Sequence, residues 1–287
     1  MSQGAPGSSW RALLGGNLPG MATTAVDPEL LRRGGLALDI DGPRATITLA
    51  RPEVLNAQTP LTWEGLRAIG ESLPGGVRVV VVRGEGRAFS AGLDKRFFTA
   101  QEVDGLPGIA GIAALPDDEA DATIAAFQAA FSWLSHPSRV SVAAVQGHAI
   151  GGGFQLALAC DLRVVADDVQ FRMAETSLGI VPDLGGTYLL VRAVGYARAV
   201  EICLTGRRVG ADEAVASGLA LRAVPASELD ATVDELVTSL LAAPPKAAAE
   251  TLGLLARAAE GADPASQLAA ERAAQLRRLR SLAAGEG

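Results

Sequence analysis

The stretch that decides the fold runs over residues 140–155 and reads Val140-Ser141-Val142-Ala143-Ala144-Val145-Gln146-Gly147-His148-Ala149-Ile150-Gly151-Gly152-Gly153-Phe154-Gln155. Its first part is a run rich in valine and alanine, which is typical of a strand covered on both faces. Its second part is a glycine loop that leads into a helix, where backbone N–H groups are free and the helix dipole favours negative charge. The stretch therefore predicts a buried strand followed by a turn that can hold an anionic oxygen.

Neighbouring stretches extend this pattern in both directions. Val77–Val82 is a valine-rich run and Leu162–Ala166 repeats its character, and helical sequence separates them from residues 140–155. A helix is predicted over Pro60–Leu73, and Leu36–Ile40 and Ala45–Ala50 predict a hairpin. Strands that alternate with helices indicate an α/β fold with a mainly parallel sheet.

The chain divides into three parts on this evidence. We expect a disordered N-terminal extension over residues 1–34, an α/β core over 35–195 and a helical C-terminal region over 196–287. The C-terminal region is rich in alanine, which favours helix. Glu102–Asp121 mixes Gly, Pro and acids, and it predicts either a surface loop or a wall of a substrate pocket.

Composition excludes several classes of protein. The chain has 287 residues, of which 49% are hydrophobic, and its formal net charge is −7. An acidic chain of this kind offers no basic field for nucleic acid, and it contains no uncharged apolar run long enough for a membrane span. Cys160 and Cys203 have no metal-ligand spacing and predict buried free thiols, which favours a cytoplasmic protein.

A second glycine loop directly follows the valine-rich strand and reads Gly84-Glu85-Gly86-Arg87-Ala88-Phe89-Ser90-Ala91-Gly92-Leu93-Asp94. Each loop places free amides at a strand-to-helix transition. Two such amides that converge on one point can hold a developing oxyanion, which contributes about 10²–10³ in rate per donor.

Five motifs, taken together, are more specific than either loop. They occur in the order Arg51-Pro52-Glu53-Val54-Leu55-Asn56-Ala57, Ala88-Phe89-Ser90-Ala91-Gly92-Leu93-Asp94, Ala143-Ala144-Val145-Gln146-Gly147-His148-Ala149-Ile150-Gly151-Gly152-Gly153, Ala159-Cys160-Asp161-Leu162-Arg163 and Leu178-Gly179-Ile180-Val181-Pro182-Asp183-Leu184-Gly185-Gly186-Thr187. Over about residues 36 to 285 the chain thus resembles the crotonase superfamily, the enoyl-CoA hydratase/isomerase family.

The resemblance implies a crotonase-like (ClpP/crotonase) spiral of ββα units with C-terminal helices that build a homotrimer or a dimer of trimers. It also implies an acyl-CoA thioester as substrate and an oxyanion hole made by the amides of Leu93 and Gly152. Coenzyme A is then part of the substrate, and no separate cofactor or metal is expected. The positions implied to contact CoA are Ala91, Gly92, Leu93, Asp94 and Lys95.

The acid–base positions depart from the hydratases that this family contains. Those hydratases have a glutamate where this chain has Gln155, and a second glutamate that this chain retains as Glu175. A carboxamide does not transfer a proton at neutral pH, and loss of a positioned acid or base removes about 10²–10⁴ in rate. A single carboxylate suffices for double-bond isomerisation, so the resemblance favours an isomerase with Glu175 as base and Asp183 assisting.

Several alternatives stay open at this stage. Gln155 can position a water, which would leave an enoyl-CoA hydratase, or the chain can be a non-catalytic acyl-CoA-binding protein. Glu175 can simply cap a turn, and Asp183 after a proline can be a helix N-cap. Asp183 also matches the nucleophile position of 4-chlorobenzoyl-CoA dehalogenases, although the chain has only 4% aromatic residues for the aromatic pocket of those proteins.

Overall fold

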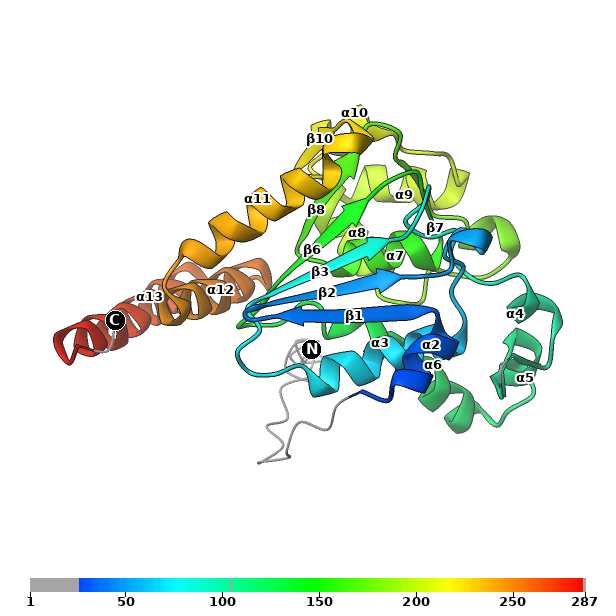
Figure 1. Ribbon diagram of the computed structural model, residues 1–287, viewed down its shortest axis with the longest axis horizontal. Coiled ribbons are helices and arrows are strands. Elements are labelled where there is room, and N and C mark those ends of the chain that lie inside the picture. Colours follow the sequence, from blue (N-terminus) through cyan, green and yellow to red (C-terminus); the bar gives the residue numbers. More distant parts are fainter. Residues whose placement is uncertain (1–25, 104, 286–287) are drawn as a thin grey trace, which may run out of the picture.

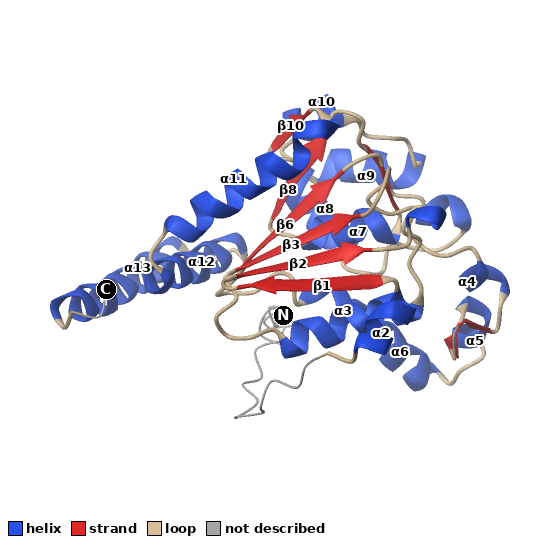
Figure 2. Cartoon of the chain, viewed as in Figure 1, coloured by secondary structure: helices blue, strands red, loops and turns tan. Residues whose placement is uncertain are grey.

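The computed structural model describes residues 26–103 and 105–285. A six-stranded sheet crosses the molecule, and helices cover both of its faces (Figure 1, Figure 2). The strand order is β1-β2-β3-β6-β8-β10; β1 is antiparallel to β2, and the other neighbouring pairs are parallel. The strands of this sheet are β1 (Leu36–Asp41), β2 (Arg44–Leu49), β3 (Val79–Gly84), β6 (Val140–Val145), β8 (Leu162–Ala166) and β10 (Arg222–Val224).

The valine-rich strand is covered on both faces, as its sequence predicts. Val80 and Val82 point into the larger core, which lies against α3 (Pro60–Ser72) and α7 (Gly152–Ala159). Val79 and Val81 point into a smaller core, which α11 (Leu229–Ala242) closes. Because neighbouring side chains of a strand face opposite ways, a continuous apolar run fits this two-sided burial. The predicted hairpin and parallel sheet are confirmed.

The remaining elements surround this sheet. Two short strands, β7 (His148–Ile150) and β9 (Gln170–Arg172), pair in parallel beside it. The other α-helices between the first hairpin and α11 are α4 (Arg96–Thr99), α5 (Ile109–Ala113), α6 (Asp117–Ser132), α8 (Gly186–Val194), α9 (Tyr196–Thr205) and α10 (Ala211–Ala216). Within the described residues, three short 3-10 helices lie in the same part of the chain, η1 (Pro52–Val54), η2 (Glu175–Leu178) and η3 (Ala226–Glu228).

The prediction of disorder over residues 1–34 is wrong for its last part. Residues 1–25 lie outside the described residues, but α2 (Pro28–Gly34) is a helix. The Asp27 side chain accepts a hydrogen bond from the Glu29 N–H, and Pro28 stands at the first helical position. Leu31 packs against the larger core. A cap and one buried contact suffice for a single short helix here, and neither is visible in composition.

Residues 102–121 are more regular than their composition indicates. They contain the small hairpin of β4 (Glu102–Val103) and β5 (Leu106–Pro107), then α5, and the start of α6. The acidic run Asp117–Glu119 occupies the first turn of α6, where the helix dipole favours negative charge. The cluster of acids is therefore a helix start rather than an irregular loop.

The region over 196–287 is helical with one exception. Its strand β10 pairs in parallel with β8 and completes the edge of the central sheet, a pairing that a three-residue segment beginning with an arginine does not signal. Beyond α11, the helices α12 (Pro245–Ala259) and α13 (Pro264–Ala283) pack against each other and project away from the sheet (Figure 1). The division of the chain at residue 195 and the role of this region in oligomerisation stay predictions.

Three further observations concern the described residues only. None of their helices combines the length and the apolar character that a bilayer crossing requires. No three His, Cys, Asp or Glu side chains among them lie close enough to share a metal ion. Cys160 and Cys203 are both free thiols; Cys160 is buried as predicted, whereas Cys203 is only partly buried.

Candidate active site

The two glycine loops are joined by backbone hydrogen bonds at the carboxyl ends of β3 and β6. Ser90 N donates to His148 O at 2.9 Å, and Ile150 N donates to Ser90 O at 3.0 Å. Gly92 has a φ of +81°, and a Cβ there would lie 2.2 Å from Ile150 O, so only glycine fits. A Cβ on Gly153 would lie 2.6 Å from Ser90 O. The loops therefore converge as predicted, because glycine allows their backbones to touch.

The amide of Leu93 points into a cavity between the loops. Gln58 N donates to Gly92 O at 2.7 Å, which fixes the plane of the Gly92–Leu93 peptide. In a trans peptide the C=O and N–H bonds point in opposite directions. Because Gly92 O faces Gln58, the Leu93 N–H faces away from Gln58, and Leu93 lines the cavity.

The amide of Gly152 meets the same cavity. Gly152 is the first residue of α7, so its N–H lies at the positive end of the helix dipole. Gly151 O accepts from Gln155 N at 2.9 Å within the helix, which directs the Gly152 N–H outward. In the part of the chain that the structure describes, neither this amide nor that of Leu93 has an acceptor. The pair can hold one anionic oxygen.

Glu175 lies in this cavity and is almost fully buried. It begins η2, and its side chain is 6% exposed. Gln155 Nε2 donates to Glu175 Oε1 at 2.7 Å. Glu175 Oε2 is buried and has no hydrogen-bond partner within residues 26–103 and 105–285. One carboxylate oxygen is thus held in place, while the other is left to act on a bound molecule.

Both the nitrogen and the oxygen of the Gln155 carboxamide form hydrogen bonds. Besides donating to Glu175, it accepts from Leu184 N at 2.9 Å and from Gly186 N at 3.1 Å through Oε1. It is 1% exposed. Because its carbonyl oxygen already accepts two backbone hydrogen bonds, Gln155 orients Glu175 and the start of α8 rather than presenting a free acceptor to water.

The electrostatic setting keeps Glu175 basic. Burial raises its pKa above the ordinary carboxyl value and outweighs the hydrogen bonds from backbone amides and Gln155; the nearby charge of Asp183 raises the pKa further. Asp183 lines the same cavity, and burial raises its pKa as well. Its backbone carbonyl accepts from Gln128 Nε2 at 2.7 Å, which ties it to α6. Two carboxyls with raised pKa values in one cavity suit proton transfer.

The positions expected to contact CoA lie on one short segment but differ in their roles. Ala91 and Leu93 line the cavity, and Gly92 packs between the loops. Lys95 is exposed at the start of α4. Asp94 is instead an internal anchor: burial raises its pKa, but hydrogen bonds and charge from Arg96, with the charge of Arg51, hold that pKa below its usual value.

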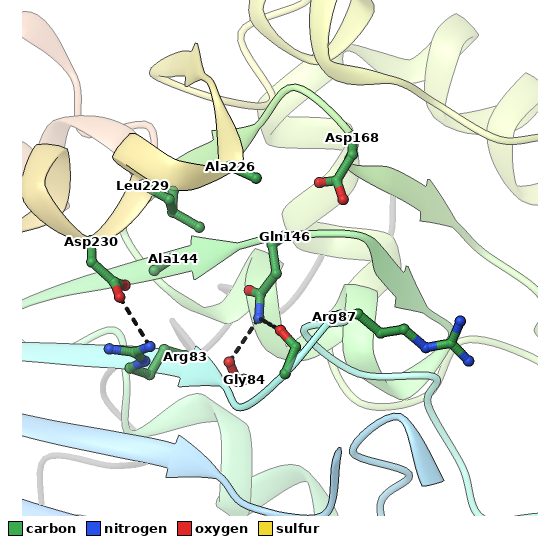
Figure 3. Close-up of a pocket in the computed structure, with 10 residues that line it drawn as sticks. Arg83, Gly84, Arg87, Ala144, Gln146, Asp168, Ala226, Leu229 and Asp230 are labelled. Carbon is green, nitrogen blue, oxygen red and sulfur yellow. Dashed lines mark hydrogen bonds and ion pairs between the residues drawn. The ribbon is translucent and has the colours of Figure 1, made fainter. Parts of the chain in front are cut away.

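The loops are also braced on the α11 side of the sheet, around a separate cavity of about 220 Å³ (Figure 3). There Gln146 Nε2 donates to Gly84 O at 2.7 Å and to Gly86 O at 3.0 Å. Asp168 accepts from Gly147 N at 3.0 Å. These bonds fix the first residues of both loops, so the positions of the two cavity amides follow from the strand ends.

Sequence reasoning missed the residues that complete the cavity. Trp63 of α3 and Phe98 of α4 line it, and Gln58 lies beneath the first loop. From the sequence, a tryptophan in a predicted helix is as consistent with an ordinary core position as with a position at a cavity. Only the contact of α3 with the loops distinguishes it.

Comparison with known proteins identifies the family. Residues 42–283 match the model of the family described as enoyl-CoA hydratase/isomerase. The chain belongs to the enoyl-CoA hydratase/isomerase family. A proposed enoyl-CoA hydratase from Thermobifida fusca YX, solved in complex with CoA, is similar in structure: it is 49% identical, with a TM-score of 0.85 over 91% of this chain and 99% of that chain. The predicted crotonase-like fold is therefore confirmed.

Curated members of the enoyl-CoA hydratase/isomerase family are more distant. A probable enoyl-CoA hydratase of Mycobacterium bovis is 36% identical over 185 residues, a match that spans 64% of this chain and 66% of that protein. A 4-chlorobenzoyl coenzyme A dehalogenase of Arthrobacter sp. is 34% identical over 202 residues, which are 70% of each chain. The match to the first of these relatives thus falls just short of two thirds of its length.

Proposed function

We propose that this member of the enoyl-CoA hydratase/isomerase family is an acyl-CoA enzyme that moves the double bond of an enoyl-CoA from the 3-position to the 2-position. The observation that carries the proposal is one buried carboxylate, Glu175, in the same cavity as the outward amides of Leu93 and Gly152. The second proton-transfer position is Gln155, a carboxamide.

The proposed reaction has two proton transfers. With the thioester oxygen against the amides of Leu93 and Gly152, Glu175 Oε2 removes a proton from C2 of a 3-enoyl-CoA. The C–H electrons form a dienolate whose charge lies on the thioester oxygen. The protonated Glu175 then returns its proton at C4, the thioester carbonyl reforms, and the double bond stands between C2 and C3. No atom is gained or lost, and no cofactor besides the CoA of the substrate takes part.

Asp183 assists in this scheme by its charge. A negative carboxylate in the same cavity favours the protonated form of Glu175, which is the form that delivers the proton at C4. We propose this supporting role for Asp183 rather than the nucleophilic role that dehalogenases give to the matching aspartate. Among the residues that the structure describes, two aromatic side chains line the cavity, Trp63 and Phe98.

Product analysis in deuterated water tests the proposal directly. Matched 3-enoyl- and 2-enoyl-CoA substrates are incubated with the purified protein, and products are followed by ultraviolet absorbance and mass spectrometry. We expect conjugated 2-enoyl-CoA from the 3-enoyl substrate. Hydroxyacyl-CoA from the 2-enoyl substrate at a higher rate would assign a hydratase instead. Binding of acyl-CoA without either reaction would assign a non-catalytic carrier.

Hydration is the second candidate, because the Mycobacterium bovis relative is named a probable enoyl-CoA hydratase. The substitution Gln155→Glu tests whether the carboxamide at this position is the reason for slow hydration by the native chain. A carboxylate at this position can still accept from Leu184 N and Gly186 N. It also supplies the missing acid, so we expect water addition to a 2-enoyl-CoA to rise by about 10²-fold or more. Gln155→Leu is the matched control and should not gain this activity.

We propose that CoA lies along Ala91–Lys95, the segment that the family resemblance implies; the Thermobifida fusca relative was solved in complex with CoA.

We also propose that the protein works in the cytoplasm as a homotrimer or dimer of trimers. An exposed apolar face on α8 and α9 supports assembly: Tyr196 is 75% exposed and Leu204 is 68% exposed. We expect sedimentation equilibrium to give three or six times 29.3 kDa. Leu204→Glu should lower that mass, whereas a native chain that sediments as a monomer would contradict the assembly.

A further inference from the structure

The cavity that the amides of Leu93 and Gly152 face is small, and aromatic side chains form part of its wall. Its volume is about 100 Å³. A cavity of about 150 Å³ in an apolar protein interior accommodates benzene, which corresponds to about 25 Å³ for each carbon atom. On this scale the cavity takes about four carbon atoms, a number that includes the carbonyl carbon held against the amides.

Trp63 is the largest side chain that lines this cavity, and it is 4% exposed. Phe98 lines the cavity too, but it is partly exposed, and Leu178 at the cavity is 56% exposed, so both lie toward solvent. Trp63 therefore belongs to the buried part of the cavity wall, with Gln155 (1% exposed) and Leu184 (5% exposed), while the more exposed lining residues lie toward its mouth.

The indole of Trp63 is held in place on its polar edge. Trp63 Nε1 donates to Gln58 Oε1 at 2.9 Å, and Gln58 Nε2 donates to Ser90 Oγ at 3.2 Å. Ser90 Oγ in turn accepts from Gly92 N at 3.1 Å. Gln58 itself is 0% exposed. Because a buried amide that loses its partner is costly, rotation of the indole out of this position is disfavoured.

The other side of the indole is packed against further rings. The centroid of Trp63 lies 4.8 Å from that of Phe127, 5.8 Å from Phe97 and 6.1 Å from Phe131. Tilted and edge-to-face ring contacts of this kind are stabilising. With rings behind it and a hydrogen bond at its edge, the indole has no free space to move into when a long acyl chain enters.

We propose that Trp63, held by Gln58, is the specificity-determining residue that restricts this site to short acyl groups of about four carbons. The inference rests on the proposed function, since it takes the cavity to be the acyl site. It adds the class of substrate: short-chain acyl-CoA thioesters rather than medium- or long-chain ones. The same hydrogen bonds connect the acyl wall to Gly92, so the wall and the Leu93 amide share one support.

Affinity for saturated acyl-CoA thioesters tests this inference without requiring turnover. Isothermal titration calorimetry is performed with butyryl-, hexanoyl- and decanoyl-CoA. In an unrestricted apolar site each added methylene tightens binding by about fourfold. We expect the native chain instead to bind butyryl-CoA about tenfold or more tightly than decanoyl-CoA. Equal or tighter binding of decanoyl-CoA would overturn the inference, whether or not any variant folds.

Trp63→Leu removes the wall and should reduce the preference for butyryl-CoA over decanoyl-CoA by about tenfold or more. Trp63→Phe retains one ring and should give an intermediate preference. Phe171→Leu is the matched control, because Phe171 is a buried ring that packs on Phe154, outside the Trp63 cluster, and does not line the cavity; its preference should equal that of the native chain. An unchanged preference in Trp63→Leu would refute the assignment. If butyryl-CoA fails to bind the native chain at all, the proposed function itself is wrong.

Discussion

Glu175→Gln should turn over a 3-enoyl-CoA about 10²–10⁴-fold more slowly than the native chain, with its affinity for a saturated acyl-CoA retained. The reason lies in the two oxygens of this carboxylate. Oε1 is held by Gln155, and the buried Oε2 has no partner in the described structure. A carboxamide at position 175 retains the shape but cannot carry the proton between C2 and C4. Steady-state kinetics and calorimetry measure the two quantities.

The control for this prediction is Asp183→Asn. It removes the other carboxylate of the cavity and should reduce turnover less than Glu175→Gln, because Asp183 acts only through its charge on Glu175. If Glu175→Gln retains native turnover, Glu175 is not the base. If Asp183→Asn is the slower of the two, the proton carrier is Asp183.

The pH dependence follows from the burial of Glu175. Its pKa is raised above 4.5, the ordinary value, so kcat/KM should rise with pH along an acid limb whose midpoint lies above 4.5. The same shift affects stability. A carboxyl whose pKa is higher in the folded than in the unfolded chain contributes stability below pH 4.5, and this contribution is lost as pH rises through the folded pKa. Glu175→Gln should therefore gain stability relative to the native chain as pH rises above 4.5, which urea unfolding measures.

Gly152→Pro should lower kcat by about 10²–10³-fold or more, since it removes one of the two proposed oxyanion donors. Proline is tolerated at the first position of a helix, where no intrahelical hydrogen bond is lost, so α7 should still form. Without the N–H, the charge of the dienolate is held by the Leu93 amide alone.

The matched control is Gly152→Ala, which retains the N–H. Its Cβ would lie 3.1 Å from Gln58 Oε1 and 3.7 Å from Leu184 Cδ1, so a shift of a few tenths of an ångström accommodates it. We expect a much smaller loss of kcat than in Gly152→Pro. Equal losses in the two variants would mean that crowding at this position, and not the amide, determines the rate. Calorimetry with butyryl-CoA distinguishes lost binding from lost turnover.

Much of the fold follows from patterns that depend on near neighbours in the chain. The valine run of β3 is apolar at every position because helices cover both faces of the sheet. Its glycine loop and that of β6 meet because adjacent parallel strands place their carboxyl ends at one edge. The helix α2 and the strand β10 were not predicted, since a seven-residue helix and a three-residue strand are stabilised mainly by contacts with distant residues.

The spacing and type of residues along the chain suffice to predict four features: the family, the parallel sheet, the two converging loops and the carboxylate at position 175. Tertiary structure alone decided three others. It directed the Leu93 amide into the cavity through the hydrogen bond from Gln58 N to Gly92 O. It also set the Gln155 carboxamide so that its nitrogen donates to Glu175 and its oxygen accepts from Leu184 N. Tertiary structure also placed Trp63 in the wall of the cavity that contains Glu175. Each of these depends on the direction of a hydrogen bond between residues far apart in the chain or on a contact between separate elements, and no local pattern encodes such a direction.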